Sequence, residues 1–393
     1  MTQLTLRSAI LRPGSSRPRL WPAAAVVAAG TLITMGSGAL PAGATTAASH
    51  ASGFRQVNLV SDIPGVAPLT DPDLVNAWGL AASPGTDAAP GSSLWVSDNG
   101  SDKSTLYSSG TASPVNKSGL VVNVTSGAPT GQVFNTDSAG FAVHDASGHS
   151  AAASFIFDTE NGTIDAWNGG VGATAPGSST VTEVPVDNGA NAVYKGLAIA
   201  QASDGHTNLY AANFRSGRVE AYDSNFKSAE LPGGLFVDPR IPAGYAPFNV
   251  QELAGKLYVT YAEQDAALHD DVAGRGHGFV DVFTNDGAFV KRLVTRGQLN
   301  SPWGLALAPA GFGRFGGDLL VGNFGDGHIN VYNPDTGAHL GELSQANGHP
   351  IVIDGLWALS FGNGNAAKTS ELLFSAGPDR ESHGLLGKIV SAG

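Results

Sequence analysis

The sequence predicts an all-β fold built from a four-stranded unit that is repeated six times. Its 393 residues include 53 glycines and 22 prolines but only 14% charged residues, which favours turns and short strands over long helices. The stretches AANFRSGRVEAYD (211–223) and VGNFGDGHINVYN (321–333) share Asn-Phe, Gly and Tyr at matching positions, 110 residues apart. A further copy, FDTENGTIDAWN (157–168), precedes the first by half that distance. These copies indicate a structural unit of roughly 50 residues.

Each unit begins with a strand that carries one large residue near its start. AWGLAAS, KGLAIA, PWGLALA and LWALSF begin at residues 77, 195, 302 and 356, and GFAVHD (140) and PFNVQEL (247) are weaker copies. Successive intervals of 62, 55, 53, 55 and 54 residues separate the aligned positions, which are Trp78, Gly140, Lys195, Phe248, Trp303 and Trp357. This position predicts the inner strand of each unit.

Three more strands follow in each unit. The second strands are SLWVSD, ASFIFD, NLYAAN, KLYVTY, DLLVGN and ELLFSA, and the third begin at a glycine and end at an aromatic residue, as in GFVDVF (278–283). Fourth strands include LVVNV (120–124), TVTEVPV (180–186) and FVKRLV (289–294). Alternation of apolar and polar residues supports each assignment. Six such units in tandem are typical of a six-bladed β-propeller of four-stranded blades.

The two ends of the chain predict how the ring closes. The sixth unit stops after its third strand, at Val390, while FRQVNLVSD (54–62) is a strand without a unit of its own. We expect residues 54–62 to complete the last blade, because closure leaves only short sheet edges exposed.

Residues 1–48 form a separate segment. They hold four arginines and no acids, then an apolar stretch from Leu20 to about Met35 and the small residues Ala42-Gly43-Ala44. This order is typical of a secretory signal peptide, with an uncleaved membrane anchor as the alternative. We therefore expect a secreted, extracellular protein with residues 49–393 as the propeller and no membrane span after cleavage.

The mature chain is acidic and lacks cysteine. Without the leader, 17 basic residues stand against 33 acidic ones, a net charge near −16. This charge argues against a nucleic-acid partner and against an anionic membrane surface. Without cysteine, the fold must rest on burial and hydrogen bonding, and neither thiol chemistry nor a Cys-ligated metal is available.

The runs DPDLVNAWGLAASPG (71–85) and LWVSDNGSDKSTLY (94–107), with the NF-x-x-G strands, resemble secreted bacterial β-propellers with NHL-like repeats. The resemblance covers residues 54–393, implies a six-bladed ring and supplies no catalytic residues, because this branch is largely uncharacterised. At the level of the fold, the chain is also similar to gluconolactonase-like and streptogramin-lyase-like propellers.

Propeller topology places the predicted site on one face of the ring. The loops that enter the inner strands and the loops between second and third strands open on the same face, and here they collect acids, amides and aromatics. The opposite face is mostly Ser, Ala, Pro and Gly. A ligand site is expected at the channel mouth on the polar face.

Three sets of residues on this face are candidates. Carboxylates and amides at related blade positions could hold a calcium ion, or could simply cap turns: Asp98, Asp158, Glu160, Asn213, Asn323 and Asp379. Other residues could bind a ligand, the aromatics by stacking on sugars unless they only wedge the blades together: Trp78, Asn99, Lys195, Arg215, Phe248, Trp303 and Trp357. His349, Glu381 and His383 are candidate proton-transfer groups in the loops of the last blade.

One loop of the polar face is longer than its counterparts. The sequence AEQDAALHDDVAGRGHG (262–278) exceeds the blade-three loop by 13 residues, so it could be a lid, a source of metal ligands or a solvated insertion.

Two functions follow. The first is a monomeric scaffold that binds an extracellular ligand, such as a small molecule, polysaccharide, cell-wall component or protein, on the acidic, aromatic-lined face. The alternative is a Ca²⁺- or other cation-dependent hydrolase or lyase of the lactonase type. Motifs such as G-x-S-x-G and H-E-x-x-H do not occur in the sequence.

Overall fold

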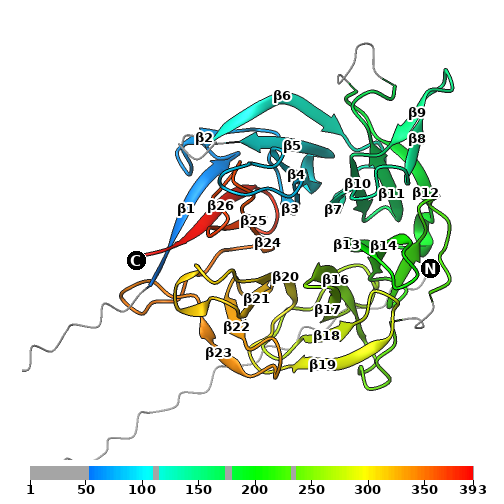
Figure 1. Ribbon diagram of the computed structural model, residues 1–393. Helices are drawn as coiled ribbons and strands as arrows, with labels where there is room; N and C mark the ends of the chain where they lie inside the picture. Colours follow the sequence, from blue (N-terminus) through cyan, green and yellow to red (C-terminus); the bar gives the residue numbers. More distant parts are fainter. Residues whose placement is uncertain (1–52, 109–114, 173–178, 232–235, 393) are drawn as a thin grey trace, which may run out of the picture. The chain divides into compact units, whose positions relative to one another are not determined.

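The computed structural model describes residues 53–108, 115–172, 179–231 and 236–392. Within these ranges, six small sheets are arranged as the blades of a six-bladed β-propeller (Figure 1). The fold class predicted from the repeat is therefore confirmed. The predicted signal peptide lies outside the described residues.

The first three blades each run outward from the channel in chain order. Blade 1 contains β3 (Ala77–Ala81), β4 (Leu94–Asp98), β5 (Lys103–Ser108) and β6 (Asn116–Asn123). Blade 2 contains β7 (Pro129–Phe134), β10 (Phe155–Thr159), β11 (Thr163–Trp167) and β12 (Glu183–Asp187). In blade 3 the described strands are β13 (Tyr194–Gln201), β14 (Thr207–Asn213) and β15 (Arg218–Tyr222).

The next two blades have the complete four strands. Blade 4 contains β16 (Tyr245–Leu253), β17 (Lys256–Glu263), β18 (Phe279–Phe283) and β19 (Phe289–Thr295). Blade 5 contains β20 (Pro302–Leu307), β21 (Leu319–Asn323), β22 (Ile329–Tyr332) and β23 (His339–Glu342). The glycine-rich run 311–317 joins β20 to β21 and includes the short 3-10 helix η3 (Gly313–Phe315), in agreement with its assignment as a connection.

Blade 6 joins the two ends of the described chain. It contains β24 (Leu356–Phe361), β25 (Leu372–Ala376) and β26 (Leu385–Ser391), and β1 (Phe54–Ser61) pairs antiparallel with β26 from Phe54 opposite Ser391 to Ser61 opposite Leu385. The short β2 (Leu69–Thr70) pairs with β1. Figure 1 shows β1 beside β26 at the C-terminus. The predicted closure by the N-terminal strand is confirmed.

The inner strand of blade 2 differs from the prediction. The segment GFAVHD was aligned with the inner strands, but Ala142–His144 forms β8, which pairs with β9 (Ser150–Ala152) in a separate hairpin. The inner strand is β7. The residue before Thr130 pairs with the end of β10, just as the residue before Trp78 pairs with the end of β4, so Thr130 takes the position of Trp78. The error arose because the inserted hairpin carries its own apolar alternation, whereas β7 has no large aromatic at the repeat position.

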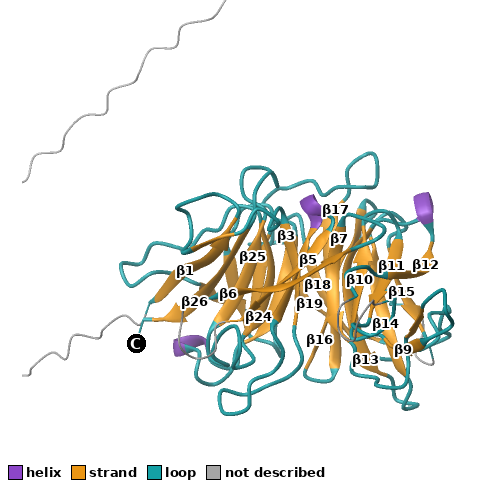
Figure 2. Cartoon of the chain, turned by 90° about the horizontal axis from the view of Figure 1, so that it is seen from above, coloured by secondary structure: helices purple, strands orange, loops and turns teal. Residues whose placement is uncertain are grey.

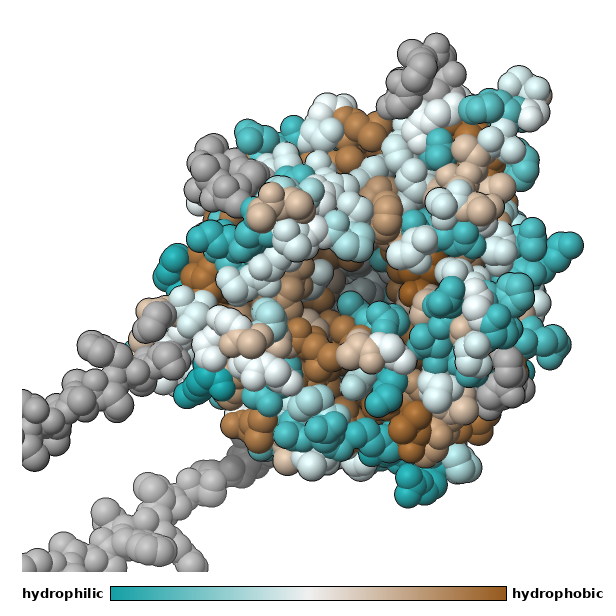
Figure 3. Space-filling model, viewed as in Figure 1, coloured by the Kyte–Doolittle hydropathy of each residue, from teal (hydrophilic) through white to brown (hydrophobic). Residues whose placement is uncertain are grey.

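Small residues let the inner strands approach one another around the channel. A Cβ on Gly79 would lie 2.4 Å from the Thr130 carbonyl oxygen, and one on Gly131 would lie 2.3 Å from the Leu197 amide nitrogen. Glycine is therefore required where neighbouring backbones meet. The space-filling view shows a hollow at the centre of the ring (Figure 3). A cavity of about 290 Å³ is lined by inner strands of all six blades.

Aromatic residues at the ends of third strands fill the spaces between blades. They are buried members of five different apolar clusters: Tyr107, Trp167, Tyr222, Phe283 and Tyr332. Each cluster combines residues of two neighbouring blades, so the repeated aromatic has the packing role that its period predicts. Among the described residues there is no helix long and apolar enough to cross a membrane.

Candidate functional site

The polar side chains that converge at the channel come from the predicted loops. Figure 2 shows the sheets from the side, with loops projecting from both faces. On one face, loops and strand ends of five blades supply a connected set of residues, called here the channel-mouth network: Asn76, Asn99, Glu160, Lys195, His269, Asp270 and Glu381. Blade 5 contributes no member. These residues lie in or next to the loops that propeller topology assigns to one face.

Lys195 is the buried centre of the network. Its side chain is 3% exposed, and its Nζ donates to Glu160 Oε1 and, at 3.2 Å, to Asp270 Oδ1. The ammonium also lies 5.2 Å from the ring centroid of Trp78. Burial alone would lower the pKa of Lys195, but the charges of Glu160 and Asp270 outweigh it and raise the pKa. The two carboxylates therefore favour the charged form of Lys195.

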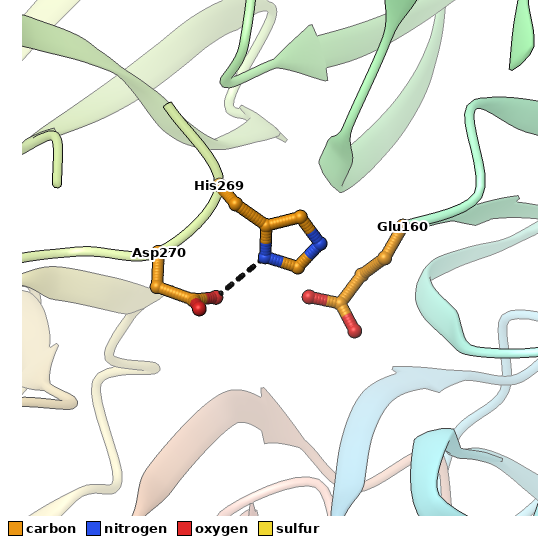
Figure 4. Close-up of side chains that lie close together, drawn as sticks. All are labelled: Glu160, His269 and Asp270. Atoms are coloured by element: carbon orange, nitrogen blue, oxygen red, sulfur yellow. Dashed lines mark hydrogen bonds and ion pairs between the residues drawn. The ribbon is translucent and has the colours of Figure 1, made fainter. Parts of the chain in front are cut away.

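Glu160, His269 and Asp270 point toward one another across two blades (Figure 4). Their potential ligand atoms all lie within 4.8 Å of one another, and His269 Nδ1 is 2.9 Å from Asp270 Oδ1. Glu160 Oε2 also accepts a hydrogen bond from Asn99 Nδ2 at 2.9 Å. The three side chains could hold a divalent cation, although Lys195 already pairs with both carboxylates.

Glu381 joins the network through an asparagine. Asn76 Nδ2 donates to Glu381 Oε2 and to Asn99 Oδ1, both at 3.1 Å, and Asn76 Oδ1 accepts from Trp357 Nε1 at 3.2 Å. Burial, followed by the negative charges of Glu160 and Asp270, raises the pKa of Glu381 to about 7. This carboxyl group can therefore gain or lose a proton near neutral pH.

The backbone that carries Glu381 is strained. Asp379, Arg380 and Glu381 have φ values of 53°, 54° and 66°, a region that non-glycine residues rarely adopt, and Asn76 has φ 49°. Strain of this kind persists only where the surroundings fix the conformation, and it is frequent at binding and catalytic sites.

The long loop of blade 4 is an ordered structure. Asp265 Oδ1 accepts hydrogen bonds from the amides of His269 and Asp270, and the Asp265 amide donates to the Asp270 carbonyl. Gln264 Nε2 donates to the Phe214 carbonyl of blade 3 at 2.6 Å. These bonds fasten the loop against blade 3 and direct Asp270 to Lys195, so the 13-residue insertion builds part of the site.

The predicted aromatic platform is the buried floor of the network. Trp78, Phe248, Trp303 and Trp357 are all at most 4% exposed. Trp357 stacks between Trp78, at 3.5 Å between centroids, and Phe324, at 3.9 Å. Because these ring faces are covered by one another, the structure favours the packing interpretation for them. Trp303 also lines the cavity.

The predicted metal candidates do not converge. Within the described residues, one three-residue group has suitable spacing, and of the six candidates it contains Glu160 alone. Asp98 and Asp158 are buried within their blades, where burial raises the pKa of Asp98 far above its usual range and that of Asp158 to about 7. Asp379 is exposed, and its amide bonds to Asp354.

The two asparagine candidates act as turn caps. Asn213 Oδ1 accepts from the amides of Val193 and Ser216, and Asn323 Nδ2 donates to the Gln298 carbonyl and to Asp326. The sequence left open that these residues cap turns instead of binding calcium, and the hydrogen bonds of both asparagines favour turn capping.

The remaining candidates lie outside the network. His383 turns to Asp62, with Nδ1 2.8 Å from Oδ2, and His349 is exposed on a turn closed by its own amide and Asn347. Arg215 is half-buried on the turn after β14, and its Nε has no hydrogen-bond partner among the described residues. Glu381 is the one proton-transfer candidate that the structure places in the network.

Asn76 was not singled out from the sequence, and His269 and Asp270 were considered only as members of the 262–278 loop. The available signals were the length of the 262–278 loop and the position of Asn76 two residues before Trp78. Neither signal gives the path of the loop, which decides that Asp270 meets Lys195.

Comparison with known proteins gives relatives without a stated activity. The chain is 32% identical over 339 residues to the uncharacterized protein R648 of Acanthamoeba polyphaga mimivirus, covering 84% of this chain and 78% of that protein. It is 33% identical over 344 residues to the uncharacterized protein L690 of the same virus, covering 84% of each. No family model matches the chain, so its likeness to NHL-like bacterial proteins stays a prediction.

Solved structures share the fold at low identity. An α-L-arabinanase of Penicillium chrysogenum, solved with arabinobiose, aligns with a TM-score of 0.50 and 11% identity, over 86% of this chain and 97% of the other. At that identity the likeness supports the propeller fold alone.

Proposed function

This chain belongs to the family of the uncharacterized mimivirus proteins R648 and L690, whose names state no activity, so we infer its function from the site. We propose that the channel-mouth network binds a carbohydrate. The observation that carries the proposal is the buried Lys195 held by Glu160 and Asp270 where loops of five blades meet. Placing these charges in a buried site is costly, and such costs are typical of functional sites.

The network has the donors and acceptors that a sugar requires. Carboxylates accept hydrogen bonds from hydroxyl groups, while asparagine and lysine donate to ring and hydroxyl oxygens. The side chains of Asp270, His269 and Glu160 are 66%, 38% and 16% exposed, so a graded set of polar groups faces the solvent. Together with the predicted signal peptide, this supports a secreted protein that binds an extracellular glycan.

The test is a glycan array that contains neutral, amino and acidic oligosaccharides, followed by calorimetry on those that bind. E160Q and K195M are expected to weaken binding at least about tenfold, because each removes a charged hydrogen bond at the centre of the network. D379N changes an exposed carboxylate of the same face and serves as the control, with unchanged affinity and thermal midpoint. Absence of binding to every glycan class would contradict the proposal.

A second candidate is a divalent-cation-dependent hydrolase or lyase. The convergence of Glu160, His269 and Asp270 favours it, with Glu381 as the proton-transfer group. If this is correct, Ca²⁺ or Mg²⁺ raises the thermal midpoint of the wild type, a chelator reverses the rise, and H269A and E160Q abolish it. No shift with either ion in the wild type would rule this candidate out.

A further inference from the structure

A second cavity lies between blades 3 and 4 and shares no lining residue with the central channel. Its volume is about 510 Å³, which is within the range typical of small-molecule pockets. The third strand of blade 3, β15, forms one wall, and the segments 228–231 and 236–241 line it together with Tyr261 of β17. No residue of the channel-mouth network takes part, so a ligand here would bind independently of the polar face.

The cavity lies beside an outer edge of β15 that is largely unpaired. Every other blade has a fourth strand, whereas the described sheet of blade 3 ends at β15. The outer edge of β15 is engaged only at its C-terminal end, where Tyr222 lies opposite Ser228 and the Ala221 carbonyl accepts a hydrogen bond from the Ala229 amide at 2.9 Å. The stretch 218–220 has no outer neighbour among the described residues and borders the cavity.

The walls of the cavity are mostly apolar. They include small, aliphatic and aromatic side chains: Val219, Ala221, Ala229, Leu231, Phe236, Val237 and Ile241. Val237 is 59% exposed, more than any other large apolar side chain among the described residues. Such walls favour the binding of an apolar body, because removing apolar surface from water is favourable.

The two carboxylates that line the cavity already have partners. Glu220 accepts hydrogen bonds at 2.6, 2.9 and 2.8 Å from three side chains: Tyr194, Tyr222 and Asn213. The buried Asp238 pairs with Arg292 and accepts a hydrogen bond from the Arg240 amide at 2.8 Å. Neither carboxylate therefore needs a donor from a ligand.

Two donors of the lining have no such partner. The exposed guanidinium group of Arg218 forms no ion pair or hydrogen bond with a described residue. The hydroxyl of Tyr261 also lacks a hydrogen-bond partner among the described residues, although Tyr261 is only 5% exposed. A cation and a buried hydroxyl that both lack an acceptor indicate a ligand with an anionic, hydrogen-bond-accepting group.

We propose that this cavity binds a medium-chain fatty acid, with the hydrocarbon chain against β15 and the carboxylate at Arg218. The one lining charge without a partner is positive, and arginine can bind a carboxylate through two parallel hydrogen bonds. Arg218 begins β15 and Tyr261 lies near the end of β17, so both belong to the polar-face ends of their strands. The Tyr261 hydroxyl is thus a second donor available to the head group.

Three amphiphiles of closely similar chain length isolate the head group. Octanoate, 1-octanol and octyltrimethylammonium carry an anionic, a neutral and a cationic head. Calorimetry at pH 7.5, below the micelle-forming concentrations, is expected to rank their affinities in that order, with at least about tenfold between octanoate and the cationic compound. Hexanoate should bind more weakly than octanoate and decanoate more tightly, by at least about tenfold for each two methylenes.

Variants assign the binding to this cavity. R218Q removes the unpaired cation, so it should lower the affinity for octanoate about tenfold and leave that for 1-octanol unchanged. R55Q, at an exposed arginine of blade 6, should change neither affinity. A229F places a ring in the cavity and should abolish binding of every chain. E160Q, in the channel-mouth network, should leave octanoate binding unchanged.

The outcomes decide the proposal without reference to glycan binding. Equal affinities for octanoate and octyltrimethylammonium, or unchanged octanoate affinity in R218Q, would overturn it. Binding of none of the chains, or full binding by an A229F protein with a normal thermal midpoint, would also overturn it. If A229F does not fold, R218Q still decides, because Arg218 is exposed. Octanoate binding that E160Q weakens as much as R218Q would contradict the assignment, since the ligand would then lie at the channel mouth.

Discussion

At the residue scale, the carboxyl groups near the channel divide into two kinds. Glu160 and Asp270 pair with Lys195, while Asp158 is fully buried, with Oδ1 2.8 Å from Thr130 Oγ1 and with Oδ2 lacking a partner among the described residues. The first kind builds the site. The second lies inside blade 2, where burial raises the pKa of Asp158 to about 7.

Asp158 should therefore make stability depend on pH. Its pKa is raised in the folded state, so its contribution is fully present below the unfolded value of 3.8 and is lost as pH rises toward about 7. D158N, which stays neutral, should match the wild type near pH 3 and exceed it increasingly as pH rises, by about 2 kcal/mol at pH 5 and by up to about 4 kcal/mol above pH 7 for a shift of this size. Urea unfolding of both proteins at pH 5 and pH 8 measures the difference.

The exposed Asp335 provides the control for this experiment. D335N should give the same difference from the wild type at pH 5 and pH 8. A D158N curve that runs parallel to the wild-type curve at both pH values would show that Asp158 is not held neutral by burial.

At the scale of elements, the repeat predicted strands well wherever packing repeats. The turn glycines Gly162, Gly217 and Gly327 have φ values of 82°, 70° and 72°, as expected for a tight turn before the third strand. The prediction failed at β7, because this inner strand carries Thr130 where four other inner strands carry an aromatic residue. Thr130 Oγ1 lies 2.9 Å from the Tyr194 carbonyl oxygen of blade 3.

The site was predictable only as a face. Propeller topology fixes which loops lie together, and Glu160, Lys195, Asn99 and Glu381 were identified on that basis. The contact between Asp270 and Lys195 depends on hydrogen bonds inside the 262–278 loop, which composition does not encode. The aromatic residues illustrate the same limit. Their repeated position in the sequence is compatible with a ligand platform and with a packed core, and only their stacking in the structure favours packing.

At the scale of the whole propeller, one strand holds the ring together. Phe54 of β1 is 2% exposed and packs at 4.8 Å from Phe312 and 5.9 Å from Phe315, measured between ring centroids, and β1 covers the edge of β26. Without β1, the edge of β26 would be open and the Phe312–Phe315 surface uncovered. Site residues of blades 1 and 6, Asn76 and Glu381, lie on the two sides of this closure.

Closure should depend on the strand itself and not on its place at the N-terminus. Phe54 lies opposite Ser391 in an antiparallel pair, and the Ala392 amide donates to the Gly53 carbonyl. A circular permutant that carries residues 53–62 after residue 393, joined by a short glycine-rich linker, should therefore form a β26–β1 hairpin and melt within a few degrees of the wild type.

Deletion of residues 53–62 should prevent cooperative unfolding, and F54A should cost about 3–5 kcal/mol of folding free energy. V290A, at a residue 43% exposed, serves as the surface control. Thermal melts of the four proteins decide the point: a permutant as unstable as the deletion would show that the covalent path through residues 63–68, rather than the strand pairing, closes the ring.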